Sequence, residues 1–236
     1  MKLKAVLFDL DGTLLPMVQE EFTGGYFSLL AARLAPRGFE PKELISNVWK
    51  GTKAMVKNDG TKTNADAFWD TFCEIYGEDK RSEIASFEEF YATDFLKAQS
   101  FCGYTPKAKE IVTFLKEHGI RTVLATNPIF PAAATEARTH WAGLEPEDFE
   151  YTTTYENSRY AKPNPQYYTE LLDKLGLKAE DCLMVGNDAA EDTAAAKTGM
   201  DVFLITDCLI NSGNADISAV PQGTFDDLKE YLKSRI

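Results

Sequence analysis

Two aspartates separated by one residue follow a short apolar run near the start of the chain. Residues 5–8 (Ala-Val-Leu-Phe) are typical of a buried strand, and Asp9 and Asp11 come directly after it. A buried carboxylate is costly unless it is paired, hydrogen-bonded or bound to a metal, so two of them here indicate a function. Side chains at i and i+2 share a face of an extended chain, which predicts that both carboxylates enter one pocket. One would attack a substrate or bind a metal, and the other would pass a proton.

The residues after this pair allow two interpretations. Gly12 lets the backbone turn sharply and approach a ligand closely, whereas an Asp-Gly pair alone is a common turn signal in which the acid only caps the loop. The buried strand before the pair and Thr13 after it favour the functional interpretation.

Two further segments could bind a phosphate. Thr126 and Asn127 end another apolar run, where a hydroxyl and nearby backbone N–H groups could hold a phosphoryl oxygen. Lys162 precedes a predicted helix and is followed by two prolines that restrict its loop, so its ammonium could pair with a phosphate and a carboxylate together. Each segment also has a structural explanation, since Thr-Asn-Pro often opens a loop and Lys-Pro often enters a helix.

A second acidic pair follows a later apolar run. Asp188 and Asp192 are four residues apart, so they share a face if the segment is helical. Acids at a helix start can simply cap it. Beside Asp9 and Asp11, however, they would form an oxygen-rich site, and Mg²⁺ takes one or two carboxylates together with waters and substrate oxygens. We therefore predict Mg²⁺ as the cofactor and these four aspartates as its candidate ligands.

The four segments resemble, in order, the four motifs of the haloacid dehalogenase-like (HAD) superfamily, whose phosphatases and phosphomutases work through an aspartyl phosphate. Residues 9–13 (Asp-Leu-Asp-Gly-Thr) match its first pattern, Asp-x-Asp-x-Thr. Thr126 matches the second motif, and Lys162, followed by proline, matches the third. The fourth motif is Gly-Asp followed by another acid, and residues 186–192 resemble it.

One position departs from the family pattern. Asn187 stands where many members have the first acid of the fourth motif, and we infer that Asp188 takes that role, a spacing also used in the family. Which of Asp188, Glu191 and Asp192 contacts the metal directly stays open.

The resemblance implies a magnesium-dependent phosphatase that hydrolyses a small phosphorylated metabolite. Asp9 would attack phosphorus, and Asp11 would protonate the leaving alcohol and then take a proton from water. Thr126 would position the phosphoryl group, with Asn127 and Gly12 also contacting substrate. Lys162 and the metal would offset the repulsion between carboxylate and phosphate.

Downstream of residue 105 the pattern alternates between strand and helix. This order predicts an α/β fold, with a doubly wound parallel sheet of about five strands between two layers of helices. Strands are expected at residues 4–8, 121–125, 150–154, 182–185 and 202–206, and helices at residues 106–118, 131–141, 165–175, 189–198 and 225–233.

Residues 15–102 interrupt this alternation and contain no convincing strand. Aromatic residues recur there at helical spacing, which favours a small helical core over a ligand cage. The resemblance implies a helical cap at this place, acting as a lid above the carboxyl ends of the strands. We predict a cap at residues 15–102, an α/β core at residues 1–14 and 103–236, and hinges at residues 14–16 and 101–104. The aromatic positions are Phe68, Phe72, Tyr76, Phe87, Phe90, Tyr91 and Phe95.

Composition excludes several classes of function. The 236 residues carry a formal net charge of −12, which disfavours nucleic acid and anionic membranes as partners. The four cysteines are scattered, so free thiols in a reducing compartment fit better than zinc or disulfides. No apolar run approaches the roughly 18 residues of a membrane span, and no signal-peptide pattern is present. We therefore expect a cytoplasmic protein, either a monomer or a small homo-oligomer.

Three alternatives to a phosphatase remain. A phosphomutase would share the same core but return the phosphoryl group to a sugar held by the cap. A haloacid dehalogenase would keep Asp9 but needs neither a second acid nor a metal. A calcium-binding module would use Asp9, Asp11, Thr13 and Glu20, although Leu14 replaces the glycine that an EF-hand loop has at its sixth position.

Overall fold

A six-stranded parallel sheet forms the centre of the protein. The computed structural model describes residues 3–236, and its strands lie in the order β3-β2-β1-β4-β5-β6. This confirms the predicted α/β fold. The strands are β1 (Ala5–Phe8), β2 (Arg121–Leu124), β3 (Tyr151–Thr152), β4 (Cys182–Gly186), β5 (Asp201–Ile205) and β6 (Gln222–Gly223).

Helices cover both faces of the sheet and form the segment after β1. Those that follow later strands are α5 (Pro106–Glu117), α6 (Ala132–Trp141), α7 (Pro165–Leu175), the 3-10 helix η6 (Asp192–Thr198) and α8 (Phe225–Lys233). Those after β1 are α1 (Gln19–Leu34), α2 (Pro41–Val56), α3 (Asn64–Tyr76), α4 (Ile84–Ala92) and the 3-10 helix η3 (Asp94–Phe101), with shorter 3-10 turns between them.

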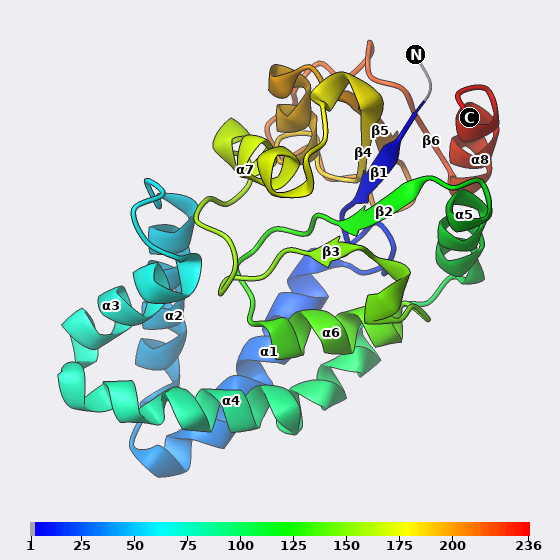
Figure 1. The fold of residues 1–236 in the computed structure, drawn as a ribbon. Helices are drawn as coiled ribbons and strands as arrows, with labels where there is room; N and C mark the ends of the chain where they lie inside the picture. Colours follow the sequence, from blue (N-terminus) through cyan, green and yellow to red (C-terminus); the bar gives the residue numbers. More distant parts are fainter. Residues whose placement is uncertain (1–2) are drawn as a thin grey trace.

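The alternation of side chains along β1 explains the three layers. Val6 and Phe8 pack on the face covered by α5 and α8, whereas Ala5 and Leu7 pack on the face covered by α7 and η6. Figure 1 shows α5 and α8 on one side of the sheet and α7 on the other. All four side chains are fully buried, as expected for a central strand of a doubly wound sheet.

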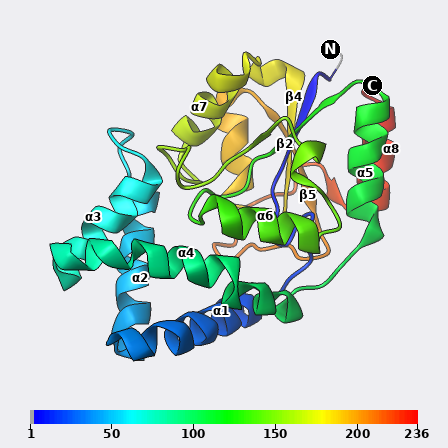
Figure 2. The same ribbon diagram turned by 60° about the horizontal axis from the view of Figure 1, so that its bottom comes forward.

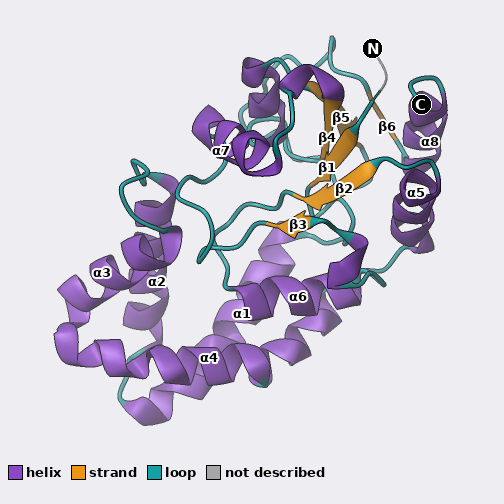
Figure 3. Cartoon of the chain, in the orientation of Figure 1, coloured by secondary structure: helices purple, strands orange, loops and turns teal. Residues whose placement is uncertain are grey.

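Residues 19–101, which we call the cap, contain only helices among their named elements. Figure 3 shows that the strands are confined to the rest of the molecule, and Figure 2 shows α4 of the cap beside α6. The two connections between cap and sheet run side by side, because Met17 pairs with Cys102 and the Gly103 N–H donates to the Pro16 carbonyl at 2.7 Å. The apolar side chains of the cap continue into the layer beneath β1, so cap and sheet share one core.

Three expectations about individual elements need correction. A sixth strand, β6, was missed because two residues at a sheet edge give no pattern in the sequence. The strand predicted at residues 150–154 is only two residues long. The helix predicted at residues 189–198 is instead a turn followed by η6, because carboxylates bind backbone N–H groups of that loop, as described below.

Two further observations concern the described part of the chain. Across residues 3–236 no helix has the length and apolar character needed to cross a bilayer. No disulfide links the cysteines of the described residues, which are Cys73, Cys102, Cys182 and Cys208.

Candidate active site

The site lies at the carboxyl end of β1, between β2 and β4. The ladder continues one residue past the strand, since the Asp9 N–H donates to the Val185 carbonyl at 2.9 Å. The chain runs from β1 to β2 and β3 on one side and then crosses to β4, β5 and β6 on the other. Ligands of open α/β sheets bind where the strand order reverses in this way. Asp9, only 7% exposed, is therefore held at the expected crevice.

A buried lysine links two of the predicted acids. The Nζ atom of Lys162 lies 2.9 Å from Asp9 Oδ1 and 2.7 Å from Asp192 Oδ1, and its side chain is fully buried. Burial alone would lower the pKa of Lys162, but the carboxylates of Asp192 and Asp9 raise it well above its ordinary value, so the ammonium stays charged. Burial raises the pKa of Asp9 to about 7, although the Lys162 charge opposes this. The lysine thus holds Asp9 in a fixed orientation.

The second carboxylate oxygen of Asp192 binds the loop after β4. Asp192 Oδ2 accepts the backbone N–H groups of Asn187 and Asp188, each at 2.9 Å. Gly186 makes room for this side chain, because a Cβ atom there would lie 2.0 Å from Asp192 Oδ2. Both oxygens of Asp192 are therefore occupied by protein donors. Asp192 lies in the site, where it orients Lys162 and the loop.

Asn187, which departs from the family pattern, forms hydrogen bonds through both polar atoms of its side chain. Its Oδ1 accepts the Thr13 hydroxyl at 3.0 Å, and its Nδ2 donates to the Cys208 carbonyl at 2.8 Å. A carboxylate could not make the second bond, because it has no N–H to donate. The side chain also packs against the turn at Gly12, whose φ is +83° and where a Cβ would lie 2.2 Å from Asn187 Nδ2.

Asp188 has one carboxylate oxygen engaged and one available. Its Oδ1 accepts the backbone N–H groups of Ala190 at 2.7 Å and Glu191 at 2.9 Å. Within the described residues, Oδ2 accepts no hydrogen bond, and the side chain lines the cavity discussed below. These bonds, with those to Asp192, fix the turn that replaces the first part of the predicted helix.

Sequence reasoning missed an arginine that binds Asp11. Arg138 of α6 is fully buried, and its Nη1 donates to Asp11 Oδ2. Its Nε donates to the Ala134 carbonyl at 3.1 Å, and its guanidinium lies over the Phe130 ring, 4.3 Å from the centroid. The available signal was its place on the buried stripe of α6 with Ala134 and Trp141, where a charge is unexpected.

Arg138 leaves Asp11 with one buried, unpaired oxygen. Asp11 Oδ1 has no hydrogen-bond partner in residues 3–236. Burial raises the pKa of Asp11, whereas the charges of Arg138 and Lys162 lower it, and burial outweighs them. An unpaired buried oxygen calls for an explanation, and a proton or a ligand group would provide one.

The residues after β2 form a network around the same point. Thr126 is buried, and its carbonyl accepts the hydroxyls of Thr153 at 2.7 Å and Tyr167 at 3.0 Å. Asn127 binds other protein groups, since its Nδ2 donates to Glu191 Oε1 at 2.9 Å and its Oδ1 accepts the Lys162 N–H at 3.2 Å. Burial raises the pKa of Glu191 to about 8.

These groups face a cavity of about 260 Å³ that extends from the sheet into the cap. Of the predicted site residues, Lys162 and Gly12 do not line it but lie behind Asp9 and Asn187, as described above. In the chain from residue 3 onward, no lysine, arginine or histidine lines the cavity. The predicted residues on its wall are Asp9, Asp11, Thr126, Asn127, Asp188 and Asp192.

The cap end of the cavity is aromatic. The aromatic spacing favoured plain core packing, but several of the same side chains also form the cavity wall, so that interpretation was incomplete. They include Phe68, Phe87 and Tyr91, which the cap contributes together with Phe22, Tyr26, Phe27, Trp49 and Trp69.

The oxygen atoms at the core end fit a magnesium ion. Asp9 and Asp188 supply carboxylate oxygens to one cavity, and hard oxygen donors are what Mg²⁺ selects. The described residues contain no cluster of three or more His, Cys, Asp or Glu side chains suited to a metal. Mg²⁺ keeps several waters and needs only one or two carboxylates, so a site with fewer protein ligands suits it.

Comparisons with known proteins agree with the fold. A sequence model of the haloacid dehalogenase-like hydrolases matches residues 3–199. The chain is 26% identical over 206 residues to a ribulose-1,5-bisphosphate 5-phosphatase of Halopiger xanaduensis, covering 85% of this chain and 83% of that one. It is 27% identical over 233 residues to a phosphoglycolate phosphatase of Rhodospirillum rubrum, covering 95% of this chain and 87% of that one.

The fold also resembles solved structures of low sequence identity. A 2-haloacid dehalogenase of Pseudomonas syringae pv. Tomato superimposes with a TM-score of 0.64 at 19% identity, covering 98% of this chain and 99% of that one. At such identity the likeness concerns the fold alone.

Proposed function

Because the chain belongs to the haloacid dehalogenase-like hydrolase family, we propose that it is a magnesium-dependent phosphatase that cleaves a small phosphomonoester through a phosphorylated Asp9. Both curated relatives reported above are phosphatases by name, which supports this branch of the family.

One observation carries the proposal. The ammonium of Lys162 lies between the carboxylates of Asp9 and Asp192, and Asp9 faces a cavity at the carboxyl end of the central strand. A carboxylate held by a buried cation is oriented for attack. The positive charge of the same cation also offsets the negative charge of an incoming phosphate. A purely structural ion pair would not require an adjoining cavity lined by further acids.

In the first step, Asp9 attacks phosphorus, so that a bond forms from its carboxylate oxygen to phosphorus while the bond from phosphorus to the alcohol oxygen breaks. The Thr126 hydroxyl and the Lys162 charge orient and stabilise the phosphoryl group. Asp11 gives its proton to the departing oxygen. Asp11 Oδ1 is suited to this because Arg138 occupies the other oxygen.

In the second step, Asp11 takes a proton from water, whose oxygen attacks phosphorus and breaks the bond to Asp9, releasing inorganic phosphate. Asp9, Asp188 and the backbone at Asp11 would hold the Mg²⁺ ion, and Asp192 would act through Lys162. When bound, the metal neutralises charge on the phosphate.

The alternatives fit the site less well. A dehalogenase needs neither Asp11 nor Asp188, yet both face the cavity. A phosphomutase must hold a phosphorylated sugar in its cap, and in residues 3–236 the cap offers no cation to the cavity. A calcium loop would use Glu20, which is exposed on α1.

The test is magnesium-dependent release of phosphate from 4-nitrophenyl phosphate by the wild type and the Asp9→Asn variant. We expect release by the wild type, loss of release on chelation of the metal, and a decrease on the order of 10³-fold or more in the variant. Equal rates for the two proteins would contradict the role of Asp9.

A further inference from the structure

The two ends of the cavity differ in charge. All the acids on its wall come from outside the cap, at the ends of β1 and β4. In the described chain, every cap residue on the wall is uncharged, and most are aromatic. Burial raises the pKa of Tyr26 to about 12, so this phenol stays neutral at physiological pH. A substrate with its phosphate beside Asp9 would therefore place its alcohol part in an uncharged, mostly aromatic space.

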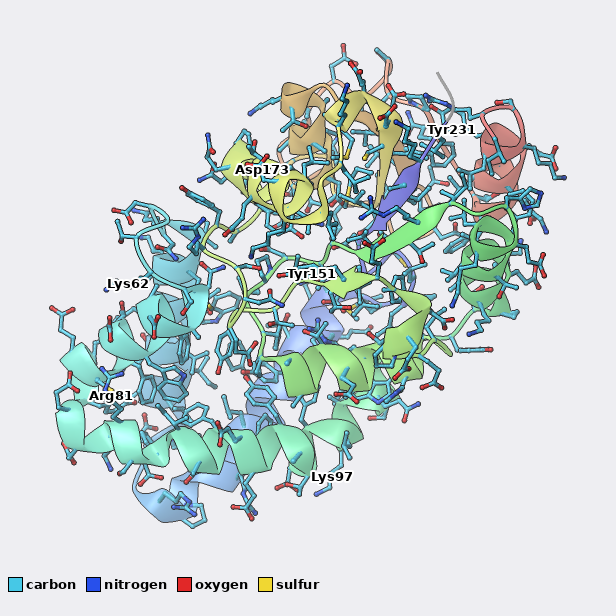
Figure 4. The ribbon with its side chains drawn as sticks, viewed as in Figure 1. Lys62, Arg81, Lys97, Tyr151, Asp173 and Tyr231 are labelled. Atoms are coloured by element: carbon cyan, nitrogen blue, oxygen red, sulfur yellow. The ribbon has the colours of Figure 1, made fainter. Side chains whose placement is uncertain are left out.

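No cation of the cap lines this space among the described residues, and three of them lie on the outer surface of the cap. Lys62 and Arg81 lie on the outer surface of the cap (Figure 4), where both pair with Asp70, at 2.9 Å and 3.0 Å. Lys97 is likewise on the outside and pairs with Asp94 at 2.5 Å. Each of these three side chains is thus held in an ion pair outside the cavity.

The two buried cations near the cavity already form ion pairs with aspartates of the protein. Lys162 pairs with Asp9 and Asp192, and Arg138 pairs with Asp11. A second anionic group on a substrate would thus be buried without a partner, and an unpaired buried charge is strongly unfavourable. The aromatic wall instead stabilises a bound apolar group, because the surface of that group is buried and contacts the rings.

We infer that the natural substrate is a phosphomonoester of an uncharged alcohol with an apolar or aromatic face, and that monoesters with a second anionic group bind poorly. This specifies the substrate class of the phosphatase site and rests on the proposed function. It also separates this chain from its relatives, because phosphoglycolate carries a carboxylate and ribulose-1,5-bisphosphate a second phosphate.

The first experiment measures binding, so that it does not depend on turnover. Benzylphosphonate and phosphonoacetate share a methylene-phosphonate group and differ in carrying a phenyl ring or a carboxylate. Calorimetric titration of the magnesium-loaded wild type should give a Kd at least about tenfold lower for benzylphosphonate. Equal affinities, or tighter binding of phosphonoacetate, would overturn the inference.

The second experiment compares hydrolysis of 2-phenylethyl phosphate, phosphocholine, phosphoglycolate and ethyl phosphate, all esters of alkyl alcohols. We expect the highest kcat/KM for 2-phenylethyl phosphate. A preference for phosphoglycolate would overturn the inference while leaving the phosphatase proposal intact, and so would a preference for phosphocholine, whose cation could stack on the rings. No hydrolysis of any ester would contradict the phosphatase proposal, and the phosphonate titration would still decide the pocket preference.

Two variants test whether the aromatic wall causes the preference for benzylphosphonate. Trp49 of α2 is on the wall yet 50% exposed, so Trp49→Ala should fold and should lower the benzylphosphonate preference several-fold. Leu96→Ala, an exposed apolar change on η3 away from the cavity, should leave the preference unchanged. An equal loss in both variants would contradict a specific role for the wall.

A cation introduced on the wall should reverse the preference. Thr52, also on α2, lines the cap end, and Thr52→Lys should improve phosphonoacetate binding about tenfold. Thr52→Met, which adds similar bulk without charge, should give no gain. Failure of the lysine variant to gain, in a protein shown by circular dichroism to be folded, would count against a missing cation as the reason for the selectivity.

Discussion

The guanidinium of Arg138 donates a hydrogen bond to the carboxylate of Asp11, joining α6 to the loop after β1 across 127 positions of the sequence. The arginine side chain is fully buried, and the aspartate is 20% exposed at the cavity. The pair thus fixes one of the two acids of the first motif, and α6 also contacts α4 and η3 of the cap.

Replacing Arg138 by methionine should destabilise the fold by about 3 to 5 kcal/mol, because it leaves the Asp11 carboxylate without its buried partner. The double variant Asp11→Asn, Arg138→Met should be more stable than the sum of the two single changes predicts. Urea denaturation of the four proteins measures this cycle. Strictly additive effects would mean that the two side chains do not interact.

Asp11→Asn should slow hydrolysis most for substrates with poor leaving groups. An alkoxide needs a proton to depart, whereas 4-nitrophenolate departs without one, so the loss should be about 10² to 10⁴-fold for alkyl esters and smaller for the nitrophenyl ester. Steady-state rates on a series of esters measure the trend. A uniform loss across the series would argue against proton transfer by Asp11.

Asp188→Asn should mainly affect magnesium binding, and Asp192→Asn should mainly affect stability. Among the described residues, Asp188 Oδ2 accepts no hydrogen bond and the side chain lines the cavity, so its replacement should weaken magnesium binding at least about tenfold with little change in stability. Asp192 binds Lys162 and two backbone N–H groups, so its replacement should lower the free energy of unfolding. Calorimetric titration with Mg²⁺ and thermal melts of both variants measure the difference. Weaker magnesium binding in Asp192→Asn and lower stability in Asp188→Asn would contradict this assignment of the two aspartates.

Asp148, remote from the site, should contribute stability that depends on pH. Burial works to raise its pKa, but hydrogen bonds from Lys109 and Lys116 and from the Glu145 N–H lower it to about 2. A carboxyl whose pKa is lower in the folded state stabilises the protein above its unfolded pKa, near 4, and that contribution is lost as the pH falls from about 4 to about 2.

Asp148→Asn should therefore lose about 1 to 2 kcal/mol at pH 7, and its deficit relative to wild type should shrink below pH 4. The control is Asp226→Asn, which removes an exposed pair with Lys107 and should leave stability nearly unchanged. Denaturation curves from pH 2 to pH 7 measure both. A deficit for Asp148→Asn that is independent of pH would contradict the ionic origin.

Much of the site's location followed from the sequence because the geometry of a parallel sheet is simple. Asp9, Thr126 and Asp188 each follow an apolar run, and parallel strands end at one edge, so their convergence on one cavity could be foreseen. The sheet itself was predictable for the same reason, since short apolar runs alternated with amphipathic helices.

Other features depended on tertiary contacts that local pattern does not encode. Arg138 reaches Asp11 only because α6 packs against the sheet in one orientation. The turn before η6 formed where an alanine-rich segment predicted a helix, because Asp188 and Asp192 bind the backbone N–H groups of that loop. The charge asymmetry of the cavity likewise required knowing which cap side chains face inward.

The most direct test of the account is chemical identification of the phosphorylated residue. Wild-type protein with Mg²⁺ and 4-nitrophenyl phosphate would be quenched in acid within milliseconds, digested with pepsin and analysed by mass spectrometry. The account predicts a phosphoryl group on Asp9, absent from the Asp9→Asn variant and accumulating in the Asp11→Asn variant if that change slows attack by water. Phosphate release without any phosphorylated Asp9, or with the label on another residue, would contradict it.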